Sequence, residues 1–510
     1  MSDWPRLGPG GSADICLLLE GTYPFVSGGV SSWVHQIIRG LPELTFSIAF
    51  LGGERAAYDE IRYEKPDNVV HLEMHYMMDG EELPPPRVVR GRHAAFEQVK
   101  QLHEYLRQPD GRAAPALQAM VELLGRRDGI TLSDFLYSKQ AWSYVQDHYE
   151  RFSSEPSFID YFWTVRNMHQ PLFKLSDIAD SLPPARIYHS VSTGYAGFLG
   201  TLLRQRRQRP FILTEHGIYT KERKIDLAQA EWIQDTRETL GTAIDEEASY
   251  IRRLWIHFFE GLGRFAYASA SPIVSLYEGN RQRQLADGAA QDRTQVVPNG
   301  IDLPRFSALR ESRPAGVPPV VGLIGRVVPI KDIKTFIRAM HSVCTQHPQA
   351  EGWIVGPEDE DAEYVHECRD LVENLGLAER VRFLGFRRVD EILPQLGVLV
   401  LTSISEALPL VVLEGFAAGV PAVTTDVGSC SELIEGSNEA DRAIGVAGEL
   451  VPIASPEDTA RAILRLLDNP VRWEATQRAG IERVERFYTQ TDMFQAYRDI
   501  YETALAEGVS

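Results

Sequence analysis

Short apolar runs alternate with amphipathic stretches along residues 318–488. The apolar runs are rich in β-branched side chains, and the stretches between them have helical periodicity. The runs are PPVVGLIGRV (318–327), EGWIVGP (351–357), VRFLGF (381–386), GVLVLTSI (397–404), PAVTTDVG (421–428) and GELVPI (448–453). Strands that are apolar on both faces and alternate with helices predict a parallel, doubly wound α/β sheet.

The N-terminal half has the same pattern with one long interruption. Its apolar runs are ADICLLLEG (13–21), LTFSIAFLGG (44–53), RIYHSV (186–191), PFILTEHG (210–217), ASPIVSLYEG (270–279) and QVVPNGID (295–302). Polar and aromatic helical segments from about residue 83 to 180 predict a helical insertion. We therefore predict two Rossmann-like domains, 1–310 and 311–489, that face a cleft, with a C-terminal helix (about 490–510) packed on the first domain.

Length and composition narrow the class of protein. A chain of 510 residues is too long for one core, which agrees with two domains. Lys+Arg 52 against Asp+Glu 71 gives a net charge of −19, which argues against a nucleic-acid partner and against adsorption to anionic lipid. Four scattered cysteines without a CxxC motif, and no signal-peptide pattern or membrane span, predict a cytoplasmic protein.

The candidate chemistry follows the predicted strands, where doubly wound sheets bind ligands. In YPFVSGGVSSWV, Gly28 and Gly29 precede a predicted helix whose free N–H groups could meet a phosphate. The loop is neither GxGxxG nor a Walker motif, so ATP and NAD lose support. The alternative is an ordinary strand-to-helix turn that needs glycine.

A pair of cations follows the strand VVGLIG. Arg326 and Lys331 lie five positions apart, at the expected mouth of a sheet in an acidic protein. An arginine fork and a mobile lysine charge suit a diphosphate. The alternative is a solvated loop with two surface cations.

Two glutamates flank the apolar stretch after the strand GVLVLTSI. Glu406 ends that strand, residues 407–411 are predicted to begin the next helix, and Glu414 lies on that helix, facing the same cleft. A carboxylate accepts hydrogen bonds from neighbouring hydroxyls of a ribose or hexose. Two carboxylates beside a phosphate site indicate a sugar nucleotide. The alternative is one capping and one buried structural glutamate.

The two glutamates, the cation pair and the glycine loop together resemble the GT-B retaining glycosyltransferases of family 4. VVPNGID (296–302) and VRFLGF (381–386) resemble two further blocks of that family. The N-terminal stretches 13–38 and 214–224, with the helical insertion, resemble more specifically the cytosolic glycosyltransferases of Pel exopolysaccharide synthesis.

The resemblance implies roles for five side chains. Arg326 and Lys331 would hold the diphosphate and stabilise the departing nucleotide. Glu414 would bind the ribose and Glu406 the transferred sugar, and His216 would lie against the donor sugar. A single histidine after a strand is otherwise more often structural.

Backbone contacts are implied as well. Gly28 and Gly29 would let the first helix approach the diphosphate and the acceptor, and the backbone near Phe386 and Arg387 would contact the base. The remaining candidates are the amides of Ala407, Leu408, Leu410 and Val411. This chain departs from the usual pattern with Gly415 after the second glutamate. It also has Pro409 in the turn, which removes one N–H.

Two charged stretches have ordinary explanations. The acidic PEDEDAEY (357–364) is predicted to complement the dipole of a following helix. The basic RQRRQR (204–209) is predicted to be a solvated helix end, with a lipid or protein contact as the alternative. No DxD follows a strand, so we expect no metal and no cofactor.

Together these features imply a retaining, metal-independent hexosyltransferase that moves sugar from a UDP-sugar to a growing exopolysaccharide. The alternatives are a sugar-nucleotide epimerase and a non-catalytic nucleotide-sugar-binding subunit of a membrane synthase. We expect no direct membrane insertion and no nucleic acid, and recruitment to the inner membrane by synthase or transporter subunits. The insertion, with its aromatic stretch 157–165, is the candidate surface.

Overall fold

The computed structural model describes residues 4–58, 60–79, 89, 93–107, 113–124, 129–153, 157–229 and 250–507. The chain divides into two compact units. Unit 1 comprises Met1–Ser275, Arg281–Gln295 and Arg498–Ser510, and unit 2 comprises Leu276–Asn280 and Val296–Tyr497. We describe each unit by itself.

Unit 1 is built on a seven-stranded sheet in the order β3-β2-β1-β4-β5-β6-β7. The strands are β1 (Ala13–Glu20), β2 (Phe46–Gly52), β3 (Val69–Tyr76), β4 (Ala185–Ser190), β5 (Phe211–Glu215), β6 (Ile273–Ser275) and β7 (Thr294–Val296). The pairs from β3 to β6 are parallel. Strand order reverses between β1 and β4, which is where such sheets bind ligands.

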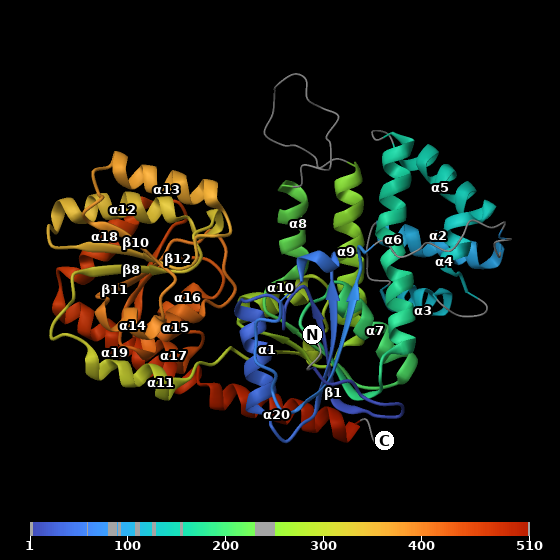
Figure 1. Cartoon of the computed structure of the whole chain (residues 1–510), viewed down its shortest axis with the longest axis horizontal. Helices are drawn as coiled ribbons and strands as arrows, with labels where there is room; N and C mark the ends of the chain where they lie inside the picture. Colours follow the sequence, from blue (N-terminus) through green and yellow to red (C-terminus); the bar gives the residue numbers. More distant parts are fainter. Residues whose placement is uncertain are drawn as a thin grey trace. The chain divides into compact units, whose positions relative to one another are not determined.

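Helices cover both faces of this sheet (Figure 1). They are α1 (Gly29–Gly40), α7 (Tyr195–Arg207), α8 (Tyr219–Gln229), α9 (Tyr250–Ser269), α10 (Glu278–Ala286) and α20 (Gln490–Glu507). Part of the C-terminal helix α20 packs on this unit: the Tyr501 hydroxyl lies 2.7 Å from His189 Nδ1, and Arg498 pairs with Glu43 at 2.7 Å. Trp33 of α1 meets the same histidine edge-on, at 5.9 Å between ring centres.

The described residues between β3 and β4 form five helices. They are α2 (His93–Arg107), α3 (Ala113–Leu123), α4 (Leu132–Tyr137), α5 (Lys139–Phe152) and α6 (Phe158–Ser181). Their apolar side chains join one continuous core with α7, α9 and the sheet. The predicted helical insertion is therefore present and is packed on the Rossmann core.

The basic run at the end of α7 is largely structural. Arg206 donates to the carbonyls of Leu124 and Ser176, and Arg207 donates to those of Ala179 and Leu182. The prediction of a solvated helix end is wrong for these two arginines, because they satisfy carbonyls around the C-terminal end of α6.

Unit 2 contains a six-stranded sheet in the order β10-β9-β8-β11-β12-β13, with every neighbouring pair parallel. The strands are β8 (Val320–Ile324), β9 (Glu351–Val355), β10 (Val381–Gly385), β11 (Val398–Leu401), β12 (Ala422–Thr425) and β13 (Gly448–Val451). One layer of helices contains α12 (Ile333–Gln346), α13 (Ala362–Asn374) and α18 (Pro456–Leu467). The other contains α15 (Leu410–Ala417), α16 (Cys430–Glu435) and α19 (Pro470–Phe487). The predicted fold class, two doubly wound sheets, is confirmed.

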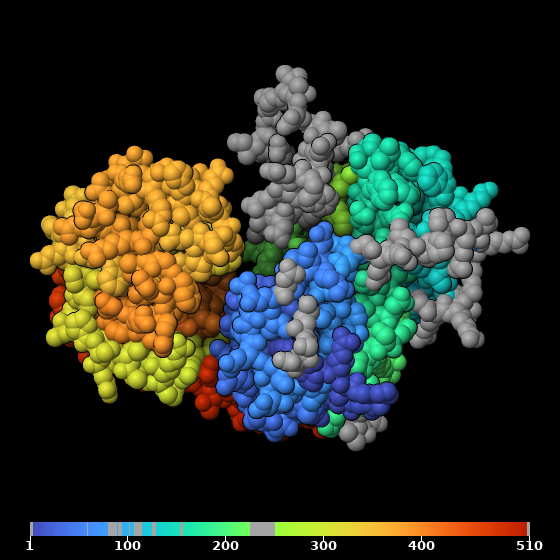
Figure 2. All heavy atoms as spheres, in the orientation of Figure 1, coloured from blue at the N-terminus to red at the C-terminus, as the bar shows by residue number. Residues whose placement is uncertain are grey.

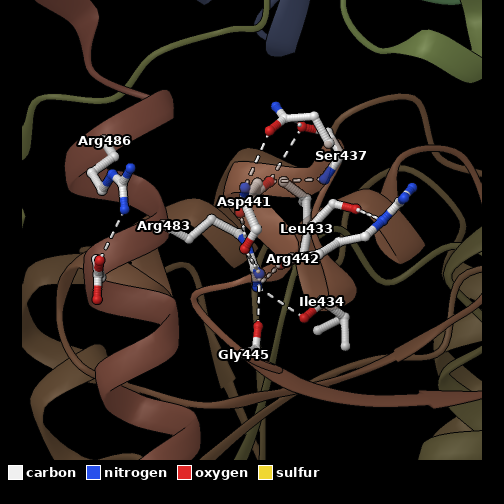
Figure 3. A network of polar contacts seen from close by, with 11 residues as sticks. Leu433, Ile434, Ser437, Asp441, Arg442, Gly445, Arg483 and Arg486 are labelled. Atoms are coloured by element: carbon white, nitrogen blue, oxygen red, sulfur yellow. Dashed lines mark hydrogen bonds and ion pairs between the residues drawn. The ribbon is translucent and has the colours of Figure 1, made fainter.

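A buried ion pair fastens the chain after α16 to helix α19 (Figure 3). Arg483 and Asp441 are fully buried, and Arg483 Nε donates to Asp441 Oδ1 at 2.6 Å. The guanidinium also donates to the carbonyl oxygens of Leu433, Ile434, Asp441 and Gly445. Because the charge and most of its donors have partners, this buried pair is well compensated.

Candidate active site

The candidate site of unit 2 lies where β8 and β11 end, at the switch point of its sheet. The two loops that follow these strands are bonded to each other. The Ile404 N–H donates to the Ile330 carbonyl at 2.8 Å, and the Thr402 hydroxyl donates to the Lys331 carbonyl at 2.9 Å. These backbone contacts hold the predicted lysine beside the predicted glutamate.

Lys331 and Glu406 form an ion pair through Lys331 Nζ and Glu406 Oε1. The Ser403 hydroxyl donates to the same carboxylate oxygen at 2.6 Å. The lysine and glutamate side chains are only 20% and 13% exposed, so water screens the pair weakly. Among the described residues, Glu406 Oε2 has no hydrogen-bond partner, which leaves it available to a sugar hydroxyl.

Arg326 lies on the same loop but has a different partner. Its Nη1 donates to both carboxylate oxygens of Glu360, at 2.8 and 2.6 Å. Both side chains are about half exposed, so this arginine is accessible from solvent. Each predicted diphosphate cation is thus paired with a carboxylate of its own sheet edge.

Helix α15 begins later than predicted. It starts at Leu410 with Pro409 as its N-cap, so Ala407 and Leu408 lie in the preceding loop. The prediction of a helix from residue 407 is wrong because proline favours the first turn and pushes the residue before it out of the helical region. The amides of Leu410 and Val411 lie in the first turn, where helices present N–H groups.

The loop before α15 is supported from behind by the loop after β12. The Ser429 N–H donates to the Ala407 carbonyl at 2.9 Å. Gly428 has φ +57, and a side chain there would overlap the carbonyls of Glu406 and Ala407. Position 428 therefore requires glycine. The close contact keeps the loop that carries Glu406 in place.

Glu414 lies half-buried on α15, near an exposed pair between Arg305 and Asp390. Burial raises the pKa of Glu414 to about 7, Arg305 opposes the shift and Asp390 adds to it. Asp390 lies three positions after Arg387, in the segment that follows β10. Its neighbour Glu414 therefore lies toward the end of β10. Glu406 and Glu414 therefore have different neighbours: Lys331 and Ser403 beside the first, and Arg305 and Asp390 beside the second.

The loop after β10 offers an exposed aromatic ring. Phe386 is 76% exposed and follows Gly385, whose φ of +62 turns the chain. The Gly356 N–H donates to the Gly385 carbonyl at 2.9 Å, so this loop is joined to the loop after β9. Arg387 is also exposed. An exposed ring beside an arginine fits a base-stacking role.

Unit 1 places its predicted residues at the carboxyl ends of β1 and β5. Gly28 precedes α1 and Gly29 begins it, and a Cβ on either would meet nothing within 4 Å. His216 follows β5 and is 7% exposed, with its ring edge-on to Trp33 at 4.7 Å. Burial lowers the pKa of His216 to about 3, so the imidazole is neutral at physiological pH.

Glu215, directly before this histidine, was missed by sequence reasoning. Its buried carboxyl accepts from the Tyr267 hydroxyl at 2.6 Å, the Gln284 amide at 3.0 Å and the Thr193 hydroxyl at 3.1 Å. Burial raises the pKa of Glu215 to about 7 despite these donors. The sequence signal was weak because the residue reads as part of an apolar strand.

Two structural features are absent from the described residues: a metal-ligand cluster and a membrane-spanning helix. No group of three or more His, Cys, Asp or Glu side chains is arranged to hold a metal ion there. Across those ranges, no helix is both long and apolar enough to cross a bilayer.

The raised pKa of Glu414 predicts pH-dependent donor affinity. In the predicted role of Glu414 as the ribose ligand, a ribose hydroxyl would donate to the ionised carboxylate, and affinity should then fall by up to about tenfold from pH 8 to pH 6 as Glu414 takes up a proton. The stability of the free protein should depend on pH in the opposite direction to donor affinity. Folding favours protonated Glu414, so this contribution to the free energy of unfolding is lost as pH rises toward 7.

Calorimetry with UDP-glucose measures this effect, because both of its phosphates are esterified and do not titrate in this range. Glu414→Gln should flatten the profile. An unchanged slope in that variant would contradict the assignment.

The two Rossmann-type sheets match the GT-B fold of glycosyltransferases. The chain belongs to the family described as domain of unknown function DUF3492. The family model matches residues 13–292, which is more than half of the chain. Residues 318–469 match the family described as Glycosyl transferases group 1. The predicted enzyme class, glycosyltransferase, is confirmed.

Curated relatives carry glycosyltransferase names. The D-inositol 3-phosphate glycosyltransferase of Saccharomonospora viridis is 28% identical over 61% of this chain and 68% of its own length. A second protein of that name, from Catenulispora acidiphila, is 32% identical over 43% of this chain and 50% of its own length. The chain thus spans between half and about two thirds of these relatives.

Solved structures share the fold over nearly the whole chain. Sucrose-phosphate synthase of Thermosynechococcus elongatus has a TM-score of 0.58, with 17% identity, covering 97% of this chain and all of that one. HepE of Anabaena, solved with UDP and glucose, has a TM-score of 0.55, with 16% identity, covering 96% of this chain and all of that one. At these identities the likeness shows the fold.

Proposed function

We propose that this chain transfers a hexose from a UDP-sugar to a growing exopolysaccharide and retains the anomeric configuration. The observation that carries the proposal is the joined arrangement of Lys331, Glu406 and Ser403 at the switch point of the second sheet. The UDP and glucose bound to HepE, a protein of the same fold, support a UDP-sugar as donor.

The donor would lie along the carboxyl edge of the second sheet. Its base would stack near Phe386 and its ribose would meet Glu414, whose position toward β10 suits that role. Arg326 and Lys331 would hold the diphosphate together with the amides of Leu410 and Val411. Gly28, Gly29 and His216 would serve the acceptor side and the transferred sugar.

Retention is proposed from the resemblance to the retaining glycosyltransferases, and the state of Glu406 bears on the route by which it would occur. A carboxylate that is paired with an ammonium group and accepts from a hydroxyl is a poor nucleophile, so a covalent sugar intermediate on it is disfavoured. The acceptor oxygen would instead attack the anomeric carbon on the face that UDP leaves. The carbon–oxygen bond to UDP breaks, and the acceptor proton passes to the departing phosphate oxygen.

Removing either cation should weaken UDP binding. Arg326→Ala or Lys331→Ala should cost roughly 1.5–3 kcal/mol of binding free energy, because each removes a charge-assisted contact. Calorimetry with UDP measures it. Lys334→Ala is the matched control. Lys334 is the second residue of helix α12 and forms an ion pair with Glu367. Equal affinity in all three variants and the wild type would remove the diphosphate assignment.

We propose that no divalent metal takes part, because two side-chain cations face the diphosphate. Donor turnover should then be unchanged by EDTA at millimolar concentration. A strict requirement for Mg²⁺ or Mn²⁺ in the same assay would contradict this part of the proposal.

We propose further that the product is a Pel-type exopolysaccharide, as for PelF, on the strength of the motifs at 13–38 and 214–224. Protein partners at the inner membrane would recruit the chain from the cytoplasm. Helices α5 and α6 carry three exposed apolar side chains that suit such a contact: Trp142 (52% exposed), Ile159 (66%) and Trp163 (49%). Figure 2 shows these helices, in teal and green, at the surface of unit 1.

A further inference from the structure

Three carboxylates of the acidic segment after β9 have different partners. Asp361 caps α13, since its carboxylate accepts from the Tyr364 N–H at 2.9 Å. The predicted role in complementing a helix dipole therefore holds for that residue. Glu358 pairs with Arg369 of helix α13 at 2.6 Å. Glu360 alone meets Arg326, the proposed diphosphate ligand.

The backbone brings Glu360 to this position. The Gly325 N–H donates to the Val355 carbonyl at 2.8 Å, and the Val327 N–H donates to the Pro357 carbonyl at 3.0 Å. A side chain on Gly356 would overlap the Gly325 carbonyl, so the two loops approach as closely as glycine allows. The acidic segment is thus held against the arginine loop whether or not the ion pair forms.

We infer that Glu360 is a selectivity residue of the donor site, which disfavours free UDP more than a UDP-sugar. The inference rests on the proposed function. Any diphosphate that binds Arg326 must compete with the Glu360 carboxylate. The Glu360 side chain is about half exposed, so its carboxylate can move into solvent.

The selectivity arises from charge. The terminal phosphate of free UDP loses its second proton at about pH 6–7. At pH 8 UDP therefore carries one more negative charge than a UDP-sugar. The Glu360 carboxylate, carried on the segment beside Arg326, repels that extra charge. Glu360 would therefore promote release of the product UDP while the donor still binds, which favours turnover.

The test compares Glu360→Gln with Glu358→Gln. Both variants remove one negative charge from the same segment, but only the first frees Arg326. UDP and UDP-glucose are titrated into the full chain by calorimetry at pH 8 and low salt. Because the pair is exposed, we expect a modest effect: Glu360→Gln should bind UDP about two- to fivefold more tightly, with a smaller gain for UDP-glucose. Glu358→Gln should resemble the wild type.

The outcomes separate this inference from the proposed function. If the wild type binds neither nucleotide, the proposed function fails. If UDP binds and Arg326→Ala weakens it, but Glu360→Gln matches Glu358→Gln, only the inference is overturned. An equal gain for UDP and UDP-glucose in Glu360→Gln would also overturn it, because the residue would then compete without selecting.

Discussion

Replacing Glu406 with glutamine should reduce sugar transfer by at least about a hundredfold and leave UDP affinity unchanged or slightly higher. The amide has the shape of the carboxylate but lacks its charge, so it stabilises a developing positive charge on the sugar poorly. UDP affinity should not fall, because the substitution releases Lys331 from its present partner. Transfer is measured as elongation of an oligosaccharide acceptor, and binding by calorimetry.

Glu414→Gln is the matched variant for this experiment. It carries the same chemical change eight positions later, on helix α15 at the proposed ribose position, and should weaken UDP itself. If the two variants lose UDP binding equally, the division of roles between the glutamates is wrong.

Arg483→Ala should have the largest effect on stability, with a loss of about 3–5 kcal/mol in the free energy of unfolding. The substitution leaves the fully buried Asp441 carboxylate without its cation, and strips donors from the carbonyls around α16. Denaturant unfolding monitored by circular dichroism measures the change.

Arg486→Ala is the control. Arg486 lies three positions after Arg483 on α19 and pairs with Glu482 at the surface. Its effect should stay within about 0.5 kcal/mol. Removing both buried partners, as Arg483→Met/Asp441→Leu, should cost less than Arg483→Ala. Equal stability of Arg483→Ala and Arg486→Ala would contradict the network in Figure 3.

The fold could be predicted because its strands are apolar on both faces. Runs such as 320–324 and 398–401 have no other stable arrangement than a covered parallel sheet, and the helical periodicity between them is clear. The spacing of Glu406 and Glu414 also placed the first in the loop after β11 and the second on the helix that follows, as the structure has them. Strand ends are readable from sequence, since buried apolar runs stop where polar side chains begin.

Pairings between loops could not be predicted. Lys331 follows β8 and Glu406 follows β11, and these strands are neighbours only through the reversal of strand order. The same holds for Glu360, which the helix-dipole argument accounted for without reference to Arg326. Arg206 and Arg207 were misjudged because a basic run looks solvated until the carbonyls around the end of α6 are known.

The most direct test of the central claim is release of UDP from a UDP-sugar by the purified chain. The chain is incubated with UDP-glucose, UDP-galactose or either N-acetyl form, with an oligosaccharide acceptor and with Glu406→Gln in parallel. We predict that at least one donor yields UDP and an elongated acceptor with the wild type, and that the variant binds UDP but yields neither product. UDP binding without turnover of any donor would contradict the account and indicate a nucleotide-sugar-binding subunit, whereas a new UDP-sugar without elongation would indicate an epimerase.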